Sequence, residues 1–412
     1  EPYSINMKII CQNQTCQHVW EYNEKLPYTN WYSKILISLH GENVIMSPND
    51  GTAIIFNGAG MPFEETKFPL IKNLGEREIL VRISLSTVCG SDLHTWQGQR
   101  PFPTPCILGH EIVGKIVDLG NDVKNDYNGD KLAKGDRIVW SMTVGCGDCY
   151  FCNQNLPQKC VSLFKYGHVQ SDNYPHLTGG FAKHIILKKG SNIFKVPPEL
   201  SDEEVAPLMC AGSTITSGLD IANFGKCDCV VIQGCGASGL YGCAFSKEMG
   251  ASKVVVIEPM KERLELAKEF GADYIINANN SDSSIIDEIK KITEGRGADY
   301  VIEVTGDPNA LPLGIKMLRI GGKYILLGAI YPKSIVSLDS SDIITKCLQI
   351  FGMHNYKPEN LRRAIELVKN TQNKYPFKKL VGPVFNFSVN GLEDAFKALD
   401  SKKSIRPAII PK

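Results

Sequence analysis

The chain has 412 residues, of which 43% are hydrophobic and 22% are charged, a composition typical of a soluble globular protein with about two domains. Its 45 Lys and Arg residues balance its 44 Asp and Glu residues, so no global field favours a nucleic acid or an anionic membrane. No apolar run reaches the roughly 18 residues that span a bilayer, and residues 1–6 lack a secretory-signal pattern. We therefore expect a cytoplasmic protein.

Residues 1–50 show no clear period and are expected to form an N-terminal appendage of unknown role. From Gly51 the chain carries short β-rich segments bounded by Gly, Pro, Asn or Asp, which predict a small, twisted, barrel-like β domain over 51–211. The segments are 53–56, 78–83, 112–117 and 136–139. Near its end, Ser201 and Glu204 form a capping-box pattern that begins a helical run.

After Cys227, apolar strands alternate with amphipathic helices, which predicts parallel βαβ units in a doubly wound sheet over about 212–350. The expected strands are 229–233, 253–257, 299–304 and 323–328, and the expected helices are 261–270 and 311–319. Residues 351–412 resume mixed helix and strand, and we expect them to return to the first domain.

A glycine-rich loop separates the first expected strand of this sheet from a helix. Gly234, Gly236 and Gly239 have the spacing that permits a tight turn, close approach of a pyrophosphate and close helix packing. Glu258 ends the next strand, where a carboxylate hydrogen-bonds a ribose and repels a 2′-phosphate, so NAD is favoured over NADP. The alternative is a purely structural glycine turn.

Four cysteines fall within fifteen residues, in a loop over about 144–162. They are Cys146, Cys149, Cys152 and Cys160. Four thiolates make a closed tetrahedral zinc site, which contributes to folding and has no open position for catalysis. An iron–sulfur cluster is the alternative, but its usual run ends in C-x3-C-P, and Val161 follows the last cysteine here.

The stretch from Cys89 to Gly120 combines a thiol, an imidazole and carboxylates on a glycine-punctuated scaffold. Cys89 and His110 are ligand types that zinc prefers, and Asp92 can accept the other ring N–H of the histidine. Ser91 and His94 offer a hydroxyl and an imidazole through which a proton could leave. Taken singly, a buried Cys or His is usually a packing residue.

The run Gly109-His110-Glu111-x2-Gly114-x5-Gly120-x2-Val123 resembles the signature of the zinc-containing alcohol dehydrogenases, which belong to the medium-chain dehydrogenase/reductase superfamily. The four-cysteine loop and the dinucleotide pattern occur in the order of that family, and the resemblance covers about 51–412. It implies a GroES-like catalytic domain, a Rossmann domain, two zinc ions and NAD per subunit, and a homodimer or homotetramer.

The resemblance also implies roles for individual residues. Cys210 would complete the catalytic zinc site with Cys89 and His110, and Glu111 would sit behind the metal. Ser91 and His94 match the family's proton-relay positions.

Three further residues match positions that contact the ligands in this family. Arg406 would contact the pyrophosphate, Arg263 the adenosine side of the cofactor, and Trp96 would line the substrate pocket and limit what binds.

The implied reaction is hydride transfer between NAD and a small alcohol, aldehyde or ketone, through a zinc-bound alkoxide. A threonine- or polyol-type dehydrogenase on the same scaffold is an alternative, and a non-catalytic protein that binds zinc and a dinucleotide is another.

Residues 87–95, 156–160 and 163–168 also resemble a subgroup associated with phosphonate metabolism. On that interpretation Arg100, Lys165 and His168 would face an anionic group; the alternative is that they are solvated surface residues.

Overall fold

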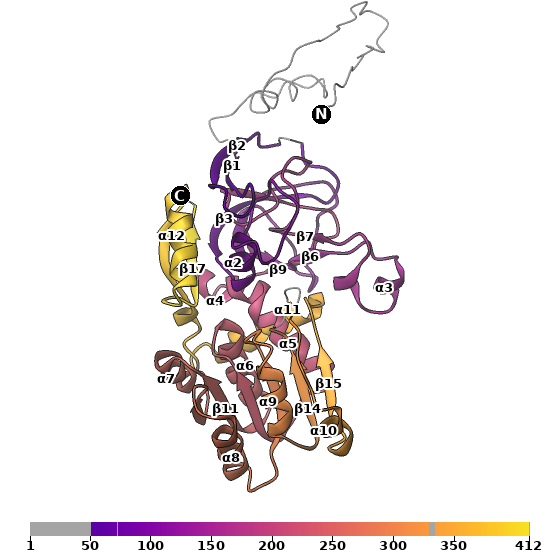
Figure 1. Cartoon of the computed structure of the whole chain (residues 1–412). Helices are drawn as coiled ribbons and strands as arrows, with labels where there is room; N and C mark the ends of the chain where they lie inside the picture. Colours follow the sequence, from indigo (N-terminus) through magenta and orange to yellow (C-terminus); the bar gives the residue numbers. More distant parts are fainter. Residues whose placement is uncertain (1–50, 72, 329–333, 412) are drawn as a thin grey trace, which may run out of the picture. The chain divides into compact units, whose positions relative to one another are not determined.

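The structure is a computed structural model that describes residues 51–71, 73–328 and 334–411. The appendage expected at residues 1–50 lies outside this described part. Within it, two large sheets organise the chain (Figure 1). No helix in these ranges is both long and apolar enough to cross a membrane.

The first large sheet has the order β16-β17-β3-β4-β5-β9, and β8 pairs with β3 beside it. All its pairings are antiparallel except that of β16 with β17. Its strands are β3 (Ile79–Thr87), β4 (Glu111–Leu119), β5 (Arg137–Trp140), β8 (His184–Leu187), β9 (Ile193–Lys195), β16 (Val381–Asn386) and β17 (Arg406–Ile410). Two small sheets accompany it: β1 (Gly51–Ile55) with β2 (Glu64–Phe68), and β6 (Thr143–Val144) with β7 (Phe164–Lys165).

The second large sheet is parallel throughout and has the order β12-β11-β10-β13-β14-β15. Its strands are β10 (Cys227–Gln233), β11 (Ala251–Glu258), β12 (Tyr274–Asn277), β13 (Ala298–Glu303), β14 (Leu318–Leu326) and β15 (Gln349–Gly352). Its helices are α5 (Ala211–Ile221), α6 (Ala237–Glu248), α7 (Lys261–Glu269), α8 (Asp282–Ile292), α9 (Ala310–Met317) and α10 (Ser340–Thr345).

Alternating residues of β10 explain why helices cover both faces of this sheet. Val230 and Ile232 belong to a core cluster that contains α6, whereas Cys229 and Val231 belong to a second cluster that contains α8 and α9. An all-apolar strand buried on both faces is the expected property of a parallel sheet. The doubly wound fold predicted from the sequence is confirmed.

β10 and β13 lie side by side at the centre of the sheet. The chain builds the sheet outwards in one direction from β10 and in the opposite direction from β13, so the strand order reverses between them. Ligands of doubly wound proteins bind at this reversal, beyond the carboxyl ends of the strands. The glycine loop at Gly234 leaves β10 at that end, and Thr305 follows β13 there. The fold thus positions the predicted dinucleotide loop at the reversal.

The chain then returns to the first sheet. β15 still pairs with β14, but β17 pairs with β3, so the change of sheet falls between Gly352 and Val381. The yellow C-terminal segment with α12 (Val389–Asp400) and β17 lies beside the indigo α2 (Gly90–Trp96) and β3 in Figure 1. Other helical segments are α3 (Tyr150–Asn153), η2 (Pro157–Lys159), α4 (Asp202–Val205), η3 (Ala206–Met209), α11 (Pro358–Thr371) and η4 (Phe377–Leu380).

The expected helix 311–319 is too long at its carboxyl end. α9 stops at Met317, and β14 already begins at Leu318. Lys346 explains the early end, because its ammonium donates to the carbonyl oxygens of Ile315, Lys316 and Leu318 at 3.2–3.4 Å. A distant lysine that satisfies terminal carbonyls leaves no local sequence signal.

α6 packs closely on the glycine loop at Gly239. A Cβ on Gly239 would lie 2.0 Å from the carbonyl oxygen of Gly234, whereas a Cβ on Gly236 would meet nothing within 4 Å. Gly239→Ala is therefore expected to cost about 2 kcal/mol of folding stability or more. A lower thermal unfolding midpoint for this variant, with an unchanged midpoint for the control Gly236→Ala, would agree; equal midpoints would contradict it.

Candidate active site

Asp92 connects the two loops that carry the first two candidate zinc ligands. Its carboxylate is completely buried and accepts hydrogen bonds from the backbone N–H groups of Cys89 (3.0 Å) and Gly109 (3.3 Å). Its Oδ1 also lies 3.2 Å from Nδ1 of His110. Because Cys89 is the N-cap of α2 and Gly109 precedes His110, one carboxylate fixes the thiol and the imidazole relative to each other.

The imidazole of His110 has different partners at its two nitrogens. Nδ1 faces Asp92, while Nε2 lies 3.3 Å from the hydroxyl of Ser91. Burial lowers the pKa of His110, but the neighbouring Asp92 outweighs it and raises this pKa to about 9. A metal ligand must present a neutral nitrogen, and an Nδ1–H that donates to a carboxylate is the arrangement that leaves Nε2 for a metal.

Cys210 joins this pair from a distant part of the chain. It is the N-cap of α5, and its Sγ lies 3.9 Å from Sγ of Cys89. Ligand atoms of Cys89, His110 and Cys210 all lie within 4.8 Å of one another. Two sulfurs on a tetrahedral zinc are about 3.8 Å apart, given Zn–S bonds of about 2.3 Å. The three side chains therefore fit a zinc ion with one open position.

The pKa values of the Cys89 and Cys210 thiols are shifted in opposite directions. The hydrogen bond with Cys210 and the charge of Arg406 hold the pKa of Cys89 well below its usual value, although burial opposes them. The same hydrogen bond, and then burial, raise the pKa of Cys210 well above its usual value. Two thiolates at this distance repel each other, so a cation between them is what would allow both to ionise.

Glu111 lies behind this group and is paired with Arg406. The Arg406 Nε donates to both carboxylate oxygens at 3.1 and 2.8 Å, and the hydroxyl of Thr87 donates at 2.5 Å. Strand register explains the arrangement, since Thr87 of β3 is opposite Glu111 of β4. Burial raises the pKa of Glu111 to about 7, while Arg406 opposes this shift.

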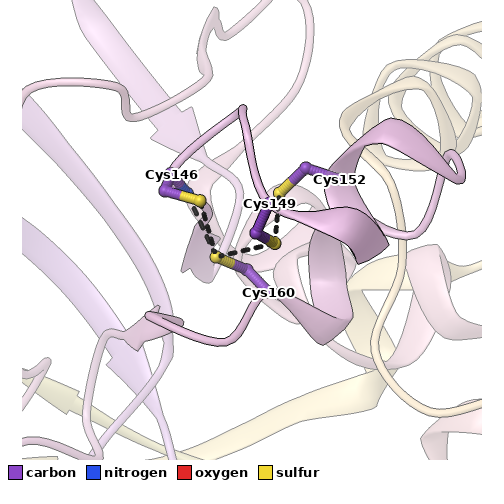
Figure 2. Close-up of side chains that lie close together, drawn as sticks. All are labelled: Cys146, Cys149, Cys152 and Cys160. Atoms are coloured by element: carbon purple, nitrogen blue, oxygen red, sulfur yellow. Dashed lines mark hydrogen bonds between the residues drawn. The ribbon is translucent and has the colours of Figure 1, made fainter.

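The four-cysteine loop forms a separate compact group (Figure 2). The sulfur of Cys160 lies 3.4 Å from that of Cys146 and 3.9 Å from that of Cys149, and Cys149 and Cys152 are 3.5 Å apart. None of them is in a disulfide, and the separations suit four thiolates on one tetrahedral zinc. The backbone N–H groups of Cys146 and Ser162 donate to Cys160, which favours a thiolate there.

The glycine loop has the geometry of a dinucleotide cradle. Gly234 has φ +96°, and a side chain there would strike Thr305, while Gly236 faces open space and is the N-cap of α6. Glu258 accepts hydrogen bonds from the backbone N–H groups of Cys235 (2.8 Å) and Met260 (3.2 Å). The acidic residue is thus held directly beside the loop.

A cavity of about 240 Å³ joins the candidate zinc site to the glycine loop. It reaches from Cys89, His110 and Cys210 to Gly236 at the sheet reversal. Its lining residues are Cys89, Gly90, Ser91, His94, Arg100, His110, Met142, Lys165, Cys210, Thr214, Gly236, Ala237, Ser238, Val304, Thr305, Leu327, Gly328, Met353, His354, Asn355 and Arg406.

Known proteins share both parts of this arrangement. Residues 75–198 match the family described as alcohol dehydrogenase GroES-like domain, and residues 237–370 match zinc-binding dehydrogenase. A 5-exo-hydroxycamphor dehydrogenase from Pseudomonas putida is 31% identical over 338 residues, which are 80% of this chain and 91% of that protein. The chain belongs to the zinc-containing alcohol dehydrogenase family.

Other relatives of this dehydrogenase differ in substrate. An L-threonine 3-dehydrogenase from Pyrococcus horikoshii is 33% identical over 283 residues, which are 68% of this chain and 76% of that protein. The crystal structure of an alcohol dehydrogenase from Thermotoga maritima superposes with a TM-score of 0.83 at 32% identity, covering 88% of this chain and all of that one. The family, the fold and the class of enzyme, a zinc-type oxidoreductase, are thereby confirmed.

Three residues of the dehydrogenase that were expected to contact ligands have the following places in the structure. Trp96 is absent from the cavity lining, and its ring packs on Phe396 at 5.3 Å between centroids. Arg406 lines the cavity, but Nε, Nη1 and Nη2 of its guanidinium contact Glu111, the Ile405 carbonyl and the Cys89 sulfur, respectively. Arg263 lies in the first turn of α7, outside the cavity lining.

Sequence reasoning missed several residues of the site. Thr87, Met353, His354 and Asn355 each contact a site residue or line the cavity. The only available signal for Thr87 was its position at the end of β3, two residues before Cys89. The segment 353–355 reaches the cavity through the tertiary fold alone.

The ion pair of Arg406 with Glu111 gives a stability prediction. Arg406→Met leaves a buried carboxylate without its partner and should cost about 3–5 kcal/mol. Without Arg406, which lowers the pKa of Glu111, the folded-state pKa rises further above its usual value. The wild type stops losing stability near its folded-state pKa of about 7, whereas the variant continues to lose it, so the cost should be greater at pH 8 than at pH 5. Chemical denaturation at the two pH values measures both effects.

The double variant Glu111→Gln with Arg406→Met is the control. It removes the charge as well as its partner, so its cost should be smaller than that of Arg406→Met and nearly independent of pH. If the double variant is as unstable as Arg406→Met, the loss of the ion pair does not explain the destabilisation.

Proposed function

We propose that the protein oxidises an alcohol to an aldehyde or ketone with NAD, and catalyses the reverse reduction, at a zinc site formed by Cys89, His110 and Cys210. The observation that carries this proposal is the single cavity that joins those three side chains to the glycine loop. A hydride can pass only between groups held in contact, and this cavity is where substrate and nicotinamide would meet.

The protein's own residues define the metal site. When bound, zinc supplies Lewis-acid chemistry that lowers the pKa of a hydroxyl and stabilises negative charge on its oxygen. Asp92 holds His110 in the orientation that presents Nε2, and the buried pair of Arg406 with Glu111 fixes the wall behind the thiol of Cys89. These contacts keep the ligands in place before substrate enters.

Ser91 and His94 provide the route by which the substrate proton would leave. Both line the cavity, and Nδ1 of His94 lies 2.6 Å from the side-chain oxygen of Gln99. That oxygen only accepts hydrogen bonds, so Nδ1 of His94 is the donor in this contact. The half-buried position of His94 suits transfer to solvent.

The four-cysteine loop is proposed to hold the second zinc, which has a purely structural role. The pair of metal sites gives a direct test. Cys210→Ala should leave one zinc per chain and lower kcat by about 10³-fold or more, because Lewis-acid stabilisation worth several kcal/mol is lost. Elemental analysis and NAD-linked turnover measure the two quantities.

Cys152→Ser is the matched variant from the other site. It should also leave one zinc per chain, yet its main effect should be a lower thermal midpoint and not a comparable loss of kcat at low temperature. Two zinc ions retained in Cys210→Ala, or full activity after complete metal removal by a chelator, would sink the assignment.

The preference for NAD over NADP rests on Glu258. This carboxylate is buried beside the glycine loop, and a 2′-phosphate near it would meet a like charge. Glu258→Gln keeps an oxygen that can accept from the Cys235 N–H but removes the charge. It should raise the ratio of kcat/KM for NADP to that for NAD about tenfold or more, whereas Glu258→Asp should keep the NAD preference. An unchanged ratio in the glutamine variant would contradict the proposal.

The proposal also covers the cellular location and the assembly of the enzyme. Two zinc sites of cysteine thiolates require reduced thiols, which supports a cytoplasmic location. Homodimeric or homotetrameric assembly is proposed from the family resemblance, and light scattering of the purified protein would decide it.

A further inference from the structure

Two cations stand in the cavity wall next to the candidate zinc site. Arg100 is only 8% exposed, and Lys165 is partly buried on β7. Both line the cavity that holds Cys89, His110 and Cys210. They come from separate segments, the loop after α2 and the strand pair β6–β7, and the fold brings them to one place.

Neither cation has a carboxylate partner within the described ranges. No ion pair involves Arg100 or Lys165, although eighteen such pairs with other residues are present. Nη1 of Arg100 is buried and lacks any hydrogen-bond partner there. The guanidinium instead lies 4.8 Å from the ring centre of Phe102, which orients it without neutralising it.

A neutral hydrogen-bond donor stands beside these two cations. His354 lines the cavity, and its Nδ1 lies 2.8 Å from the ammonium of Lys159. Burial, and then the charges of Lys159, Lys165 and Arg100, lower the pKa of His354 to about 3, so its ring is neutral. Since Nδ1 accepts from the lysine, Nε2 of this ring carries the proton and can donate.

The charges of the metal site balance these cations only in part. With a divalent metal bound, two thiolates would be balanced by the metal, and Glu111 is paired with Arg406. Asp92 attracts both Arg100 and Lys165, but it supplies one negative charge against two positive ones. A buried cation without a partner is costly unless a ligand supplies the opposite charge.

We propose that Arg100 and Lys165 form a subsite for an anionic group of the substrate, so that the enzyme acts on an alcohol or aldehyde bearing a phosphonate or carboxylate. This proposal rests on the proposed function of the zinc site. The hydroxyl carbon would lie at the zinc site and the anion at the two cations. Oxidation of R–CH2OH by NAD would give R–CHO, NADH and a proton, with the anionic group unchanged.

The same cavity favours anionic alcohols that lack an ammonium group. No Asp or Glu is among its lining residues as described, so the ammonium of an amino acid such as threonine would find no carboxylate partner there, whereas the carboxylate of threonine could contact the two cations. His168 does not line the cavity and packs on Phe102 at 4.4 Å between ring centres. The proposal therefore rests on Arg100 and Lys165, which do line the cavity.

The first test compares three alcohols of similar size: 2-hydroxyethylphosphonate, 3-hydroxypropanoate and propan-1-ol. The zinc-loaded enzyme should have a higher kcat/KM for at least one anionic alcohol than for propan-1-ol. Arg100→Met and Lys165→Met should each lower the ratio of the anionic to the neutral kcat/KM about 30-fold, the factor for one charge-assisted hydrogen bond. The phosphonate and carboxylate arms decide which anion is preferred.

Lys188→Met is the matched control variant. Lys188 is an exposed cation 5.0 Å from the ring centre of Phe164, and it lies outside the cavity lining. Lys188→Met removes the same charge as Lys165→Met. An equal drop in its ratio of anionic to neutral kcat/KM would reveal a general electrostatic effect and overturn the subsite. Arg100→Lys keeps the charge and should recover part of the ratio, which separates charge loss from misfolding.

The second test does not depend on turnover. Methylphosphonate and acetate should bind the zinc-loaded enzyme in calorimetric titrations, and Arg100→Met should weaken the binding of the preferred anion about 30-fold. Binding should persist with saturating NAD; competition with NAD would assign the cations to the cofactor and overturn the proposal. Anion binding without any alcohol oxidation would refute the proposed function alone, and oxidation of propan-1-ol without anion binding would refute the subsite alone.

Discussion

The buried carboxylate of Asp92 is the constraint on which the arrangement of the site depends. It accepts hydrogen bonds from the backbone at Cys89 and Gly109 and orients the ring of His110. A charged group without water is stable only when its acceptors are filled, so these three contacts must form together. The start of α2 and the start of β4 are thereby held at one distance, which sets the space available between the thiol and the imidazole.

The remainder of the site is placed by the contact of the two sheets. Cys210 is the N-cap of α5, and the glycine loop follows β10. The thiol that would complete the proposed metal site and the loop that would bind the cofactor therefore belong to one continuous segment. Arg406 begins β17 and reaches Glu111 and Cys89 from the far end of the chain. Residues from distant segments thus line one cavity at the sheet reversal, where ligands of doubly wound proteins bind.

The cavity explains how this dehydrogenase could differ from its relatives in substrate. In our proposal the scaffold shared with the family would supply the metal site, the cofactor loop and the proton route. Arg100, Lys165 and His354 line the cavity wall and would set what else the substrate must carry. Positive charge opposite the hydroxyl end of a substrate fixes its orientation as well as its affinity, because an anion held at one end leaves the other end at the metal.

The sequence by itself determined the local chemistry. The metal-ligand spacing, the glycine pattern before a helix and the apolar strands are encoded over short distances, where residue type and backbone conformation suffice. Only the tertiary structure decided that Trp96 packs on Phe396 and that Arg406 donates to Glu111. It also decided that α9 ends where Lys346 donates to its last carbonyl oxygens. The wall of the cavity likewise joins Arg100, Lys165 and His354 across more than 250 residues of sequence. Contacts between distant segments arise from packing and charge pairing, which leave no periodic trace in a single chain.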